Sequence, residues 1–247
     1  LIKSHAGWCS RLESSILSPM ASDWIVLATA SAIEGVGQAS AEMLIGAGCD
    51  IRLPDTFQAH PAAALQPLLA DVQGIYAGVD EFSAKVLASE EAAKLQIISR
   101  WGVGYDSIDV AAATELGIVI TYTPGLLDDA VADYTFALLL GVARRIHTGH
   151  LSMHTGGWSQ QWGHDVHGKT LGIVGCGRIG TAVARRAAGF NMRLLAYDPV
   201  PNKTAQDLGV EFVPLETLLQ QSDYVSLHAA VTPETEGLIS APQLHLM

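Results

Sequence analysis

Short apolar runs alternate with helical stretches along the first half of the chain. The runs are rich in Ile, Val and Leu and several are closed by Gly or Pro, which is typical of buried strands. We predict strands at Trp24–Ala28, Asp50–Leu53, Gly74–Ala77, Leu95–Ser99 and Ile118–Thr121, and helices at Gln38–Ala47, Ala62–Ala70 and Ile108–Leu116. Strands that alternate with helices favour an α/β fold with a parallel sheet.

The pattern changes after Tyr122, where we place a domain boundary. A long helical pattern with a dense apolar face runs from Asp128 to about Met153, and a loop rich in Gly, Trp and His follows at Gly156–Gly168. A second α/β unit then begins, with a strand at Leu171–Val174, a helix at Thr181–Gly189 and a strand at Arg193–Tyr197. We therefore expect an N-terminal extension (1–19), a first domain (20–121) and a second domain (122–247) that carries an arm (128–168).

Composition narrows the class of protein. Hydrophobic residues make up 49% of the chain, enough for a sizeable core, and the longest apolar runs are too short to span a bilayer. The formal net charge of −11 disfavours nucleic acid as a partner, because binding it depends on Lys and Arg. The three cysteines are far apart, with no metal or disulfide spacing, which suits the reducing cytoplasm. Residues 1–19 resemble a transit peptide or, as we favour, read-through upstream of Met20.

A glycine pattern follows the strand at Leu171–Val174. It reads Gly175-x-Gly177-x-x-Gly180 and opens a helix that leads to a second strand. This context is that of a dinucleotide-binding fingerprint. Gly175 permits the tight turn, Gly177 lets the backbone approach a pyrophosphate, and Gly180 lets the helix pack closely on the strand. A turn that uses glycine only for packing is the alternative.

An acidic residue ends the second strand of this unit. Asp198 lies where its carboxylate can accept hydrogen bonds from the hydroxyls of an adenosine ribose. A carboxylate also repels a 2′-phosphate, so the sequence predicts NAD rather than NADP. Lys203 lies close enough to soften this preference.

Four segments of the chain, taken together, resemble the D-isomer-specific 2-hydroxyacid dehydrogenases, the group that includes D-3-phosphoglycerate dehydrogenase and the glyoxylate and hydroxypyruvate reductases. The segments are Arg100–Asp109, Thr123–Asp133, Gly168–Gly180 and Leu227–Thr235. The resemblance implies two Rossmann-like domains, a flavodoxin-like substrate domain and a dinucleotide-binding domain. It also implies hydride transfer between NAD(H) and C2 of a small 2-hydroxy or 2-oxo acid.

The resemblance assigns roles to individual residues. Gly102, Val103 and Gly104 resemble a loop whose backbone N–H groups hold the substrate carboxylate, although a plain turn is the alternative for these glycines. Arg100 matches a phosphate-binding position of the phosphoglycerate enzymes, but Gly78 stands where another arginine is expected. The remaining cofactor contacts that the resemblance implies are Val131, Arg178, Ile179, His228, Ala229 and Thr235. Ala230 stands where the family usually has proline, so the resemblance does not fix the shape of the adenosine pocket beside His228 and Ala229.

The catalytic residues of the family, an arginine, a carboxylate and a histidine, fall in segments that would follow Met247. We therefore assign no catalytic residue in this chain and expect activity to need residues beyond it. We count three strands in the second sheet, which would leave Leu171–Val174 as an exposed edge, so we expect an incomplete cofactor domain and a longer natural polypeptide. An NAD-binding regulator like the corepressors of this fold, or an inactive truncated member, is the alternative function.

The long helical region also predicts an interface. Its apolar face exceeds what one domain needs, and the family carries a dimer arm here, so we expect a homodimer. His147, His150 and His154 share one face of this region. A polar face near a subunit contact explains them better than a metal site, and we predict no bound metal.

Overall fold

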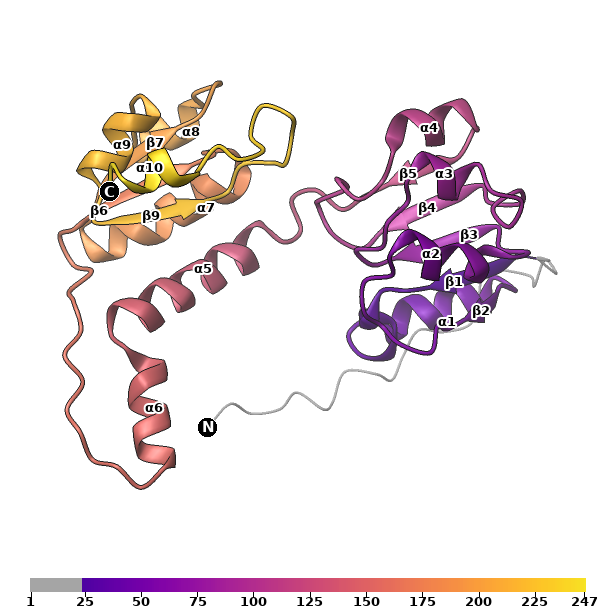
Figure 1. The fold of residues 1–247 in the computed structure, drawn as a ribbon, viewed down its shortest axis with the longest axis horizontal. Coiled ribbons are helices and arrows are strands. Elements are labelled where there is room, and N and C mark those ends of the chain that lie inside the picture. Colours follow the sequence, from indigo (N-terminus) through magenta and orange to yellow (C-terminus); the bar gives the residue numbers. More distant parts are fainter. Residues whose placement is uncertain (1–23) are drawn as a thin grey trace. The chain divides into compact units, whose positions relative to one another are not determined.

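The strands form two parallel sheets, one in each of two units. The structure, a computed structural model, describes residues 24–247 (Figure 1), so the extension predicted at 1–19 lies outside them. Contacts divide the described chain into unit 1 (residues 24–101 and 107–121) and unit 2 (residues 102–106 and 122–247). The α/β class and the parallel sheets are confirmed. None of the helices in the described part is long and apolar enough to cross a membrane.

Unit 1 is built on a sheet of order β2-β1-β3-β4-β5. Its strands are β1 (Ile25–Ala28), β2 (Asp50–Arg52), β3 (Gly74–Ala77), β4 (Ile97–Arg100) and β5 (Val119–Thr121). Its α-helices are α1 (Gln38–Gly46), α2 (Ala62–Leu65), α3 (Ala84–Leu87) and α4 (Val110–Glu115). The predicted helix 62–70 divides, because Gln66–Leu69 forms a 3-10 turn around Pro67, which has no N–H to donate. The strand order reverses between β1 and β3. In sheets of this kind, ligands bind in the crevice outside the carboxyl ends of the two strands at which the order reverses.

Unit 2 has a four-stranded sheet of order β8-β7-β6-β9. Its strands are β6 (Thr170–Val174), β7 (Arg193–Tyr197), β8 (Glu211–Phe212) and β9 (Tyr224–Leu227). Its α-helices are α5 (Asp128–Ala143), α6 (Ile146–His154), α7 (Arg178–Ala187), α8 (Lys203–Asp207), α9 (Leu215–Gln221) and α10 (Ala241–Leu244). The expectation that β6 is an exposed edge is wrong. It pairs with β7 on one side and β9 on the other, and Leu171 and Ile173 are fully buried.

Side chains alternate across the unit 2 sheet and form a core on each face. Leu171, Ile173 and Leu194 join the core that α5 and α7 cover. Val174 and Leu195 join the core beneath α9. Successive side chains of a strand point to opposite faces of the sheet, so both faces of this sheet are apolar and each is covered by helices.

The long helix predicted from Asp128 to Met153 is interrupted. Arg145 has a φ of 52°, and the chain restarts as α6. The carbonyl oxygen of Ala143 accepts a hydrogen bond from the N–H of His164 at 2.7 Å, so the returning loop satisfies the end of α5. A Cβ on Gly163 would lie 2.5 Å from that same oxygen, so the close approach requires glycine.

Candidate functional site

The glycine loop between β6 and α7 has the geometry that its sequence predicts. Gly175 has a φ of 86°, and a Cβ there would lie 2.4 Å from the backbone nitrogen of Ala229. A Cβ on Gly180 would lie 2.4 Å from the carbonyl oxygen of Gly175, so the helix packs against the strand as the fingerprint requires. Gly177 differs, because a Cβ there would meet no atom within 4 Å. It stands beside open space at the start of the helix.

The N-terminus of α7 is uncapped. The helix begins at Arg178, three residues earlier than predicted, and its N-cap, Gly177, has no side chain to offer. The first N–H groups of a helix have no partner inside it, and together with the helix dipole they favour an anion. Ten helical residues preceded by a glycine with open space on one side therefore fit the pyrophosphate of a dinucleotide.

Asp198 lies beside the glycine loop, half-buried at the end of β7. Its Oδ2 accepts a hydrogen bond from the N–H of Cys176 at 2.8 Å, and its Oδ1 accepts one from Val200 at 2.9 Å. A carboxylate has about four acceptor positions, so ribose hydroxyls can still be bound. Asn202 donates to the carbonyl oxygen of Cys176 and caps α8 by accepting from Ala205 at 2.8 Å. Cys176 is thus held from both sides.

Burial raises the pKa of the Cys176 thiol, and the nearby Asp198 raises it further. This suits a small side chain that fills space in the core rather than a reactive thiol.

The role of Asn202 was missed by sequence reasoning. Its signal was local, because an Asn directly before a helical stretch is a strong N-cap.

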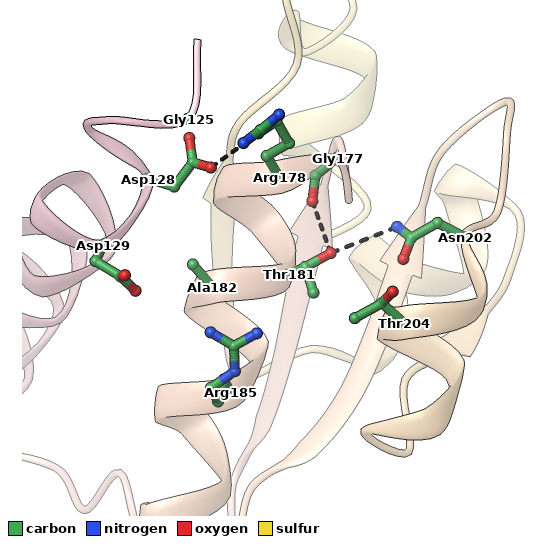
Figure 2. Close-up of a pocket in the computed structure, with 10 residues that line it drawn as sticks. All are labelled: Gly125, Asp128, Asp129, Gly177, Arg178, Thr181, Ala182, Arg185, Asn202 and Thr204. Atoms are coloured by element: carbon green, nitrogen blue, oxygen red, sulfur yellow. Dashed lines mark hydrogen bonds and ion pairs between the residues drawn. The ribbon is translucent and has the colours of Figure 1, made fainter.

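An open cavity of about 450 Å³ borders the start of α7 (Figure 2). It is lined by Gly125, Asp128, Asp129, Gly177, Arg178, Thr181, Ala182, Arg185, Asn202 and Thr204. On its wall, Arg178 donates from Nε to Oδ2 of Asp128 at 3.0 Å. Gly125 has a φ of 84°, which favours glycine, and its Cα faces the guanidinium of Arg178.

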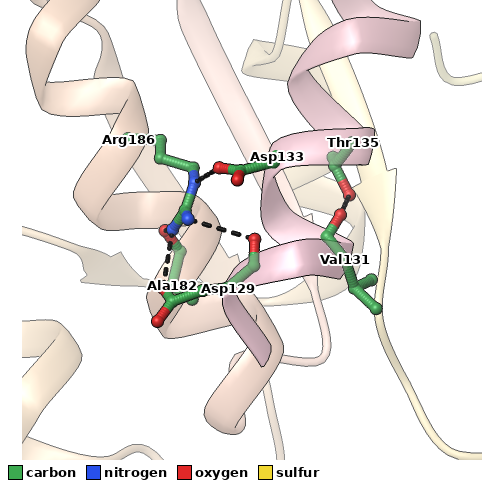
Figure 3. Close-up of polar contacts among 6 residues, drawn as sticks. All are labelled: Asp129, Val131, Asp133, Thr135, Ala182 and Arg186. Atoms are coloured by element: carbon green, nitrogen blue, oxygen red, sulfur yellow. Dashed lines mark hydrogen bonds and ion pairs between the residues drawn. The ribbon is translucent and has the colours of Figure 1, made fainter. Parts of the chain in front are cut away.

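A second arginine of α7 fastens that helix to α5 (Figure 3). Arg186 donates from Nε to Asp133 at 2.5 Å and from Nη1 to the Asp129 side chain at 3.1 Å. It also donates to the backbone oxygens of Asp129 and Ala182. These two carboxylates raise the pKa of the guanidinium. The contact holds the helix of the glycine loop against α5.

The other predicted cofactor contacts do not share one cavity. Val131 and His228 line a cavity of about 400 Å³ between α5 and β9. Ala229 and Thr235 line a different one, of about 220 Å³. Burial lowers the pKa of His228, whose Nε2 lies 2.8 Å from Oγ of Ser226. Ile179 packs against the core beneath α7.

The predicted substrate residues fall into both units. Arg100 ends β4 in unit 1 and donates to the carbonyl oxygen of Trp101. The loop Gly102–Val103–Gly104 belongs to unit 2, where the carbonyl oxygen of Gly102 accepts from the N–H of Thr123 at 3.0 Å and from its Oγ1 at 3.1 Å. Gly102 has a φ of 142°, which favours glycine.

A buried polar cluster in unit 1 was not found by sequence reasoning. Asp80 is 1% exposed, and it accepts from the hydroxyl of Thr29 and from the backbone N–H of His60 at 3.1 Å. Nδ1 of His60 lies 2.6 Å from the same carboxylate. The cluster joins the segments that follow β1, β2 and β3. Its residues are 20 to 51 positions apart and form no motif, so only the fold reveals it.

Comparisons with known proteins give the family. The family model described as D-isomer specific 2-hydroxyacid dehydrogenase, NAD binding domain, matches residues 136–247, which identifies NAD as the cofactor of unit 2. The glyoxylate reductase of Korarchaeum cryptofilum (strain OPF8) is 49% identical over 175 residues, which are 68% of this chain and 52% of that protein. The chain spans about half the length of the curated relatives it matches.

Solved structures agree. The TT0316 protein from Thermus thermophilus superposes with a TM-score of 0.77 at 36% identity, over 90% of this chain and 70% of that one. The D-lactate dehydrogenase of Salmonella gives a TM-score of 0.69 at 30% identity, over 90% of this chain and 67% of that one. The chain therefore belongs to the D-isomer specific 2-hydroxyacid dehydrogenase family.

Proposed function

We propose that the protein transfers a hydride between NAD(H) and C2 of a small 2-oxo or 2-hydroxy acid, with D-specificity. The observation that carries this proposal is the glycine loop, where an uncapped helix, open space at Gly177 and the carboxylate of Asp198 stand together. The cofactor supplies the hydride when bound. The chain's own residues orient it and hold its phosphates, and the loop at Gly102–Gly104 would hold the substrate carboxylate through backbone N–H groups.

Support for the substrate class comes from two sources. The relatives are named glyoxylate reductase and D-lactate dehydrogenase, and both names refer to short acids. In unit 1, a Cβ on Gly78 would lie 3.2 Å from the carbonyl oxygen of Thr29, so this backbone has little room for the arginine expected there in phosphoglycerate enzymes. A small unphosphorylated acid fits both observations.

The test is oxidation of NADH with glyoxylate, hydroxypyruvate, pyruvate and phosphohydroxypyruvate, followed by loss of NADH absorbance. We expect the 247-residue chain to bind NADH, and we expect turnover to depend on the family positions for proton transfer, because reduction of a carbonyl takes up a proton as well as a hydride. A protein that also carries those positions should reduce the short acids. If such a protein binds NADH but reduces none of the four acids, the proposal is wrong.

Cofactor preference gives a further expected result. NADH should bind more tightly than NADPH, because Asp198 is fixed beside the ribose position and opposes a 2′-phosphate. Asp198→Asn keeps the acceptor for Cys176 and removes the charge, so the ratio of the two affinities should fall by about tenfold, the effect of about 1.4 kcal/mol. Fluorescence titration of both reduced cofactors measures it. Equal affinities in the unsubstituted chain would contradict the assignment.

We also propose that α5, α6 and the loop after them form a homodimer interface. Val142 is 78% exposed and Trp158 is 88% exposed, and Leu138 and Ile146 on the same arm are exposed as well. Large apolar surfaces of this kind mark interfaces. Sedimentation equilibrium should show a dimer at micromolar concentration, and Val142→Lys should shift it toward the monomer. A monomeric unsubstituted chain would exclude this interface.

Localisation in the cytoplasm completes the proposal. Cys49 and Cys176 form no disulfide in the described structure, which suits a reducing compartment. The formal net charge of −11 disfavours nucleic acid as a partner.

A further inference from the structure

The three arginines of α7 differ in how fully their donors are used. All three nitrogen groups of Arg186 are engaged by α5 or by its own helix. Arg185 has no polar partner among the described residues. Arg178 is intermediate, because only its Nε is bound, to Asp128. Such partial engagement is what a side chain needs if it is to be oriented and still bind a ligand.

The geometry around Arg178 restricts it further. The Asp128 side chain is 18% exposed, whereas that of Arg178 is 69% exposed, so a largely buried carboxylate holds an accessible cation. The guanidinium lies against Gly125, whose φ of 84° favours glycine over a residue with a side chain. Neither Nη group of Arg178 forms a hydrogen bond with the described residues. They remain available at the cavity that borders the start of α7 (Figure 2).

We infer that Asp128 is a positioning residue for cofactor binding, which holds Arg178 by Nε so that its Nη groups face the pyrophosphate at the glycine loop. The inference rests on the proposed function of that loop. Simple electrostatics predicts the opposite effect, because a carboxylate near a pyrophosphate should weaken binding. The sign of the change in affinity therefore separates positioning from repulsion.

The experiment measures NADH affinity of the chain by fluorescence titration. Asp128→Asn should weaken binding roughly five- to tenfold, within the range by which residues of one ion-pair network are coupled. Arg178→Ala should weaken it at least as much, and adding Asp128→Asn to Arg178→Ala should weaken it no further. Asp128→Glu should recover part of the loss, because it restores the carboxylate.

Asp133→Asn is the matched control. It removes the same charge from the same helix but does not line the cavity, and Arg186 keeps Asp129 as its partner, so NADH affinity should change less than about twofold. Equal weakening by Asp128→Asn with and without Arg178 would show a merely structural role and overturn the inference. So would unchanged or tighter binding by Asp128→Asn alone. An unsubstituted chain that fails to bind NADH would overturn the proposed function together with the inference.

Discussion

Gly177→Ala should leave the fold intact and weaken NADH binding about a hundredfold. The new Cβ meets no protein atom within 4 Å, and the backbone of Gly177, at φ −74°, is open to alanine. The methyl group instead projects into the space beside the start of α7, where the pyrophosphate must approach. Losing about two charge-assisted hydrogen bonds at about 1.5–3 kcal/mol each accounts for an effect of this size.

Gly175→Ala is the contrasting variant. Its Cβ would meet the backbone of Ala229 at 2.4 Å, and its φ of 86° is unfavourable for alanine. The left-handed backbone costs about 1–2 kcal/mol and the overpacking about 1–3 kcal/mol. We expect this variant to melt about 4–20 °C lower, since about 1 kcal/mol shifts the melting temperature of a protein of this size by about 2–4 °C.

The measurement pairs thermal melting with NADH titration for both variants. Binding that survives Gly177→Ala would mean that the pyrophosphate does not pass this glycine. A lowered melting temperature for Gly177→Ala would mean that the space beside it is filled by protein.

Asp80→Ala should destabilise unit 1 by about 3–5 kcal/mol. The carboxylate is buried and satisfies the Thr29 hydroxyl, the backbone N–H of His60 and the His60 ring. Removing it leaves the Thr29 hydroxyl and the backbone N–H of His60 without this acceptor away from water, and each buried group left unsatisfied costs about 1–3 kcal/mol. Because total stability is only about 5–15 kcal/mol, the loss is a large fraction of it.

Asp71→Ala is the control for this variant. Asp71 also forms an ion pair, with Lys94 at 2.5 Å, and that pair holds the pKa of its carboxyl below the ordinary value. Both side chains are 60% exposed, so water replaces the contact and urea unfolding should be almost unchanged. Similar urea midpoints for Asp80→Ala and the unsubstituted chain would show that the cluster does not stabilise unit 1.

Sequence reasoning succeeded where local pattern and tertiary structure agree. The bounds of β3 and β7 match their predictions, because each apolar run is bounded by polar residues or Gly. Two glycines of the fingerprint, Gly175 and Gly180, stand where a Cβ would lie 2.4 Å from backbone atoms, as a glycine turn followed by a closely packed helix requires. The family was also correct, since four ordered segments carried it.

The misses have physical causes that lie outside any local window. α5 ends where the N–H of His164, about twenty residues further along the chain, bonds to Ala143, and the left-handed backbone at Arg145 follows there with no glycine or proline to signal it. β9 was missed because Tyr224–Leu227 is short and includes Ser226, yet it gains stability by pairing with the buried β6. The His60–Asp80 contact joins the segments that follow β2 and β3, which lie 20 residues apart, so no local pattern signals it.

The helix α6 has a thermodynamic consequence of its own. None of its nine residues is buried, and an isolated helix of that length is marginal in water. Its backbone amides should therefore exchange with deuterium almost as fast as those of an unfolded peptide when nothing covers it, while those of α7 exchange only on deep unfolding. Deuterium uptake by residues 146–154 therefore measures how far α6 is covered. If these amides exchange more slowly as the protein concentration rises, α6 is being buried by association of the chains.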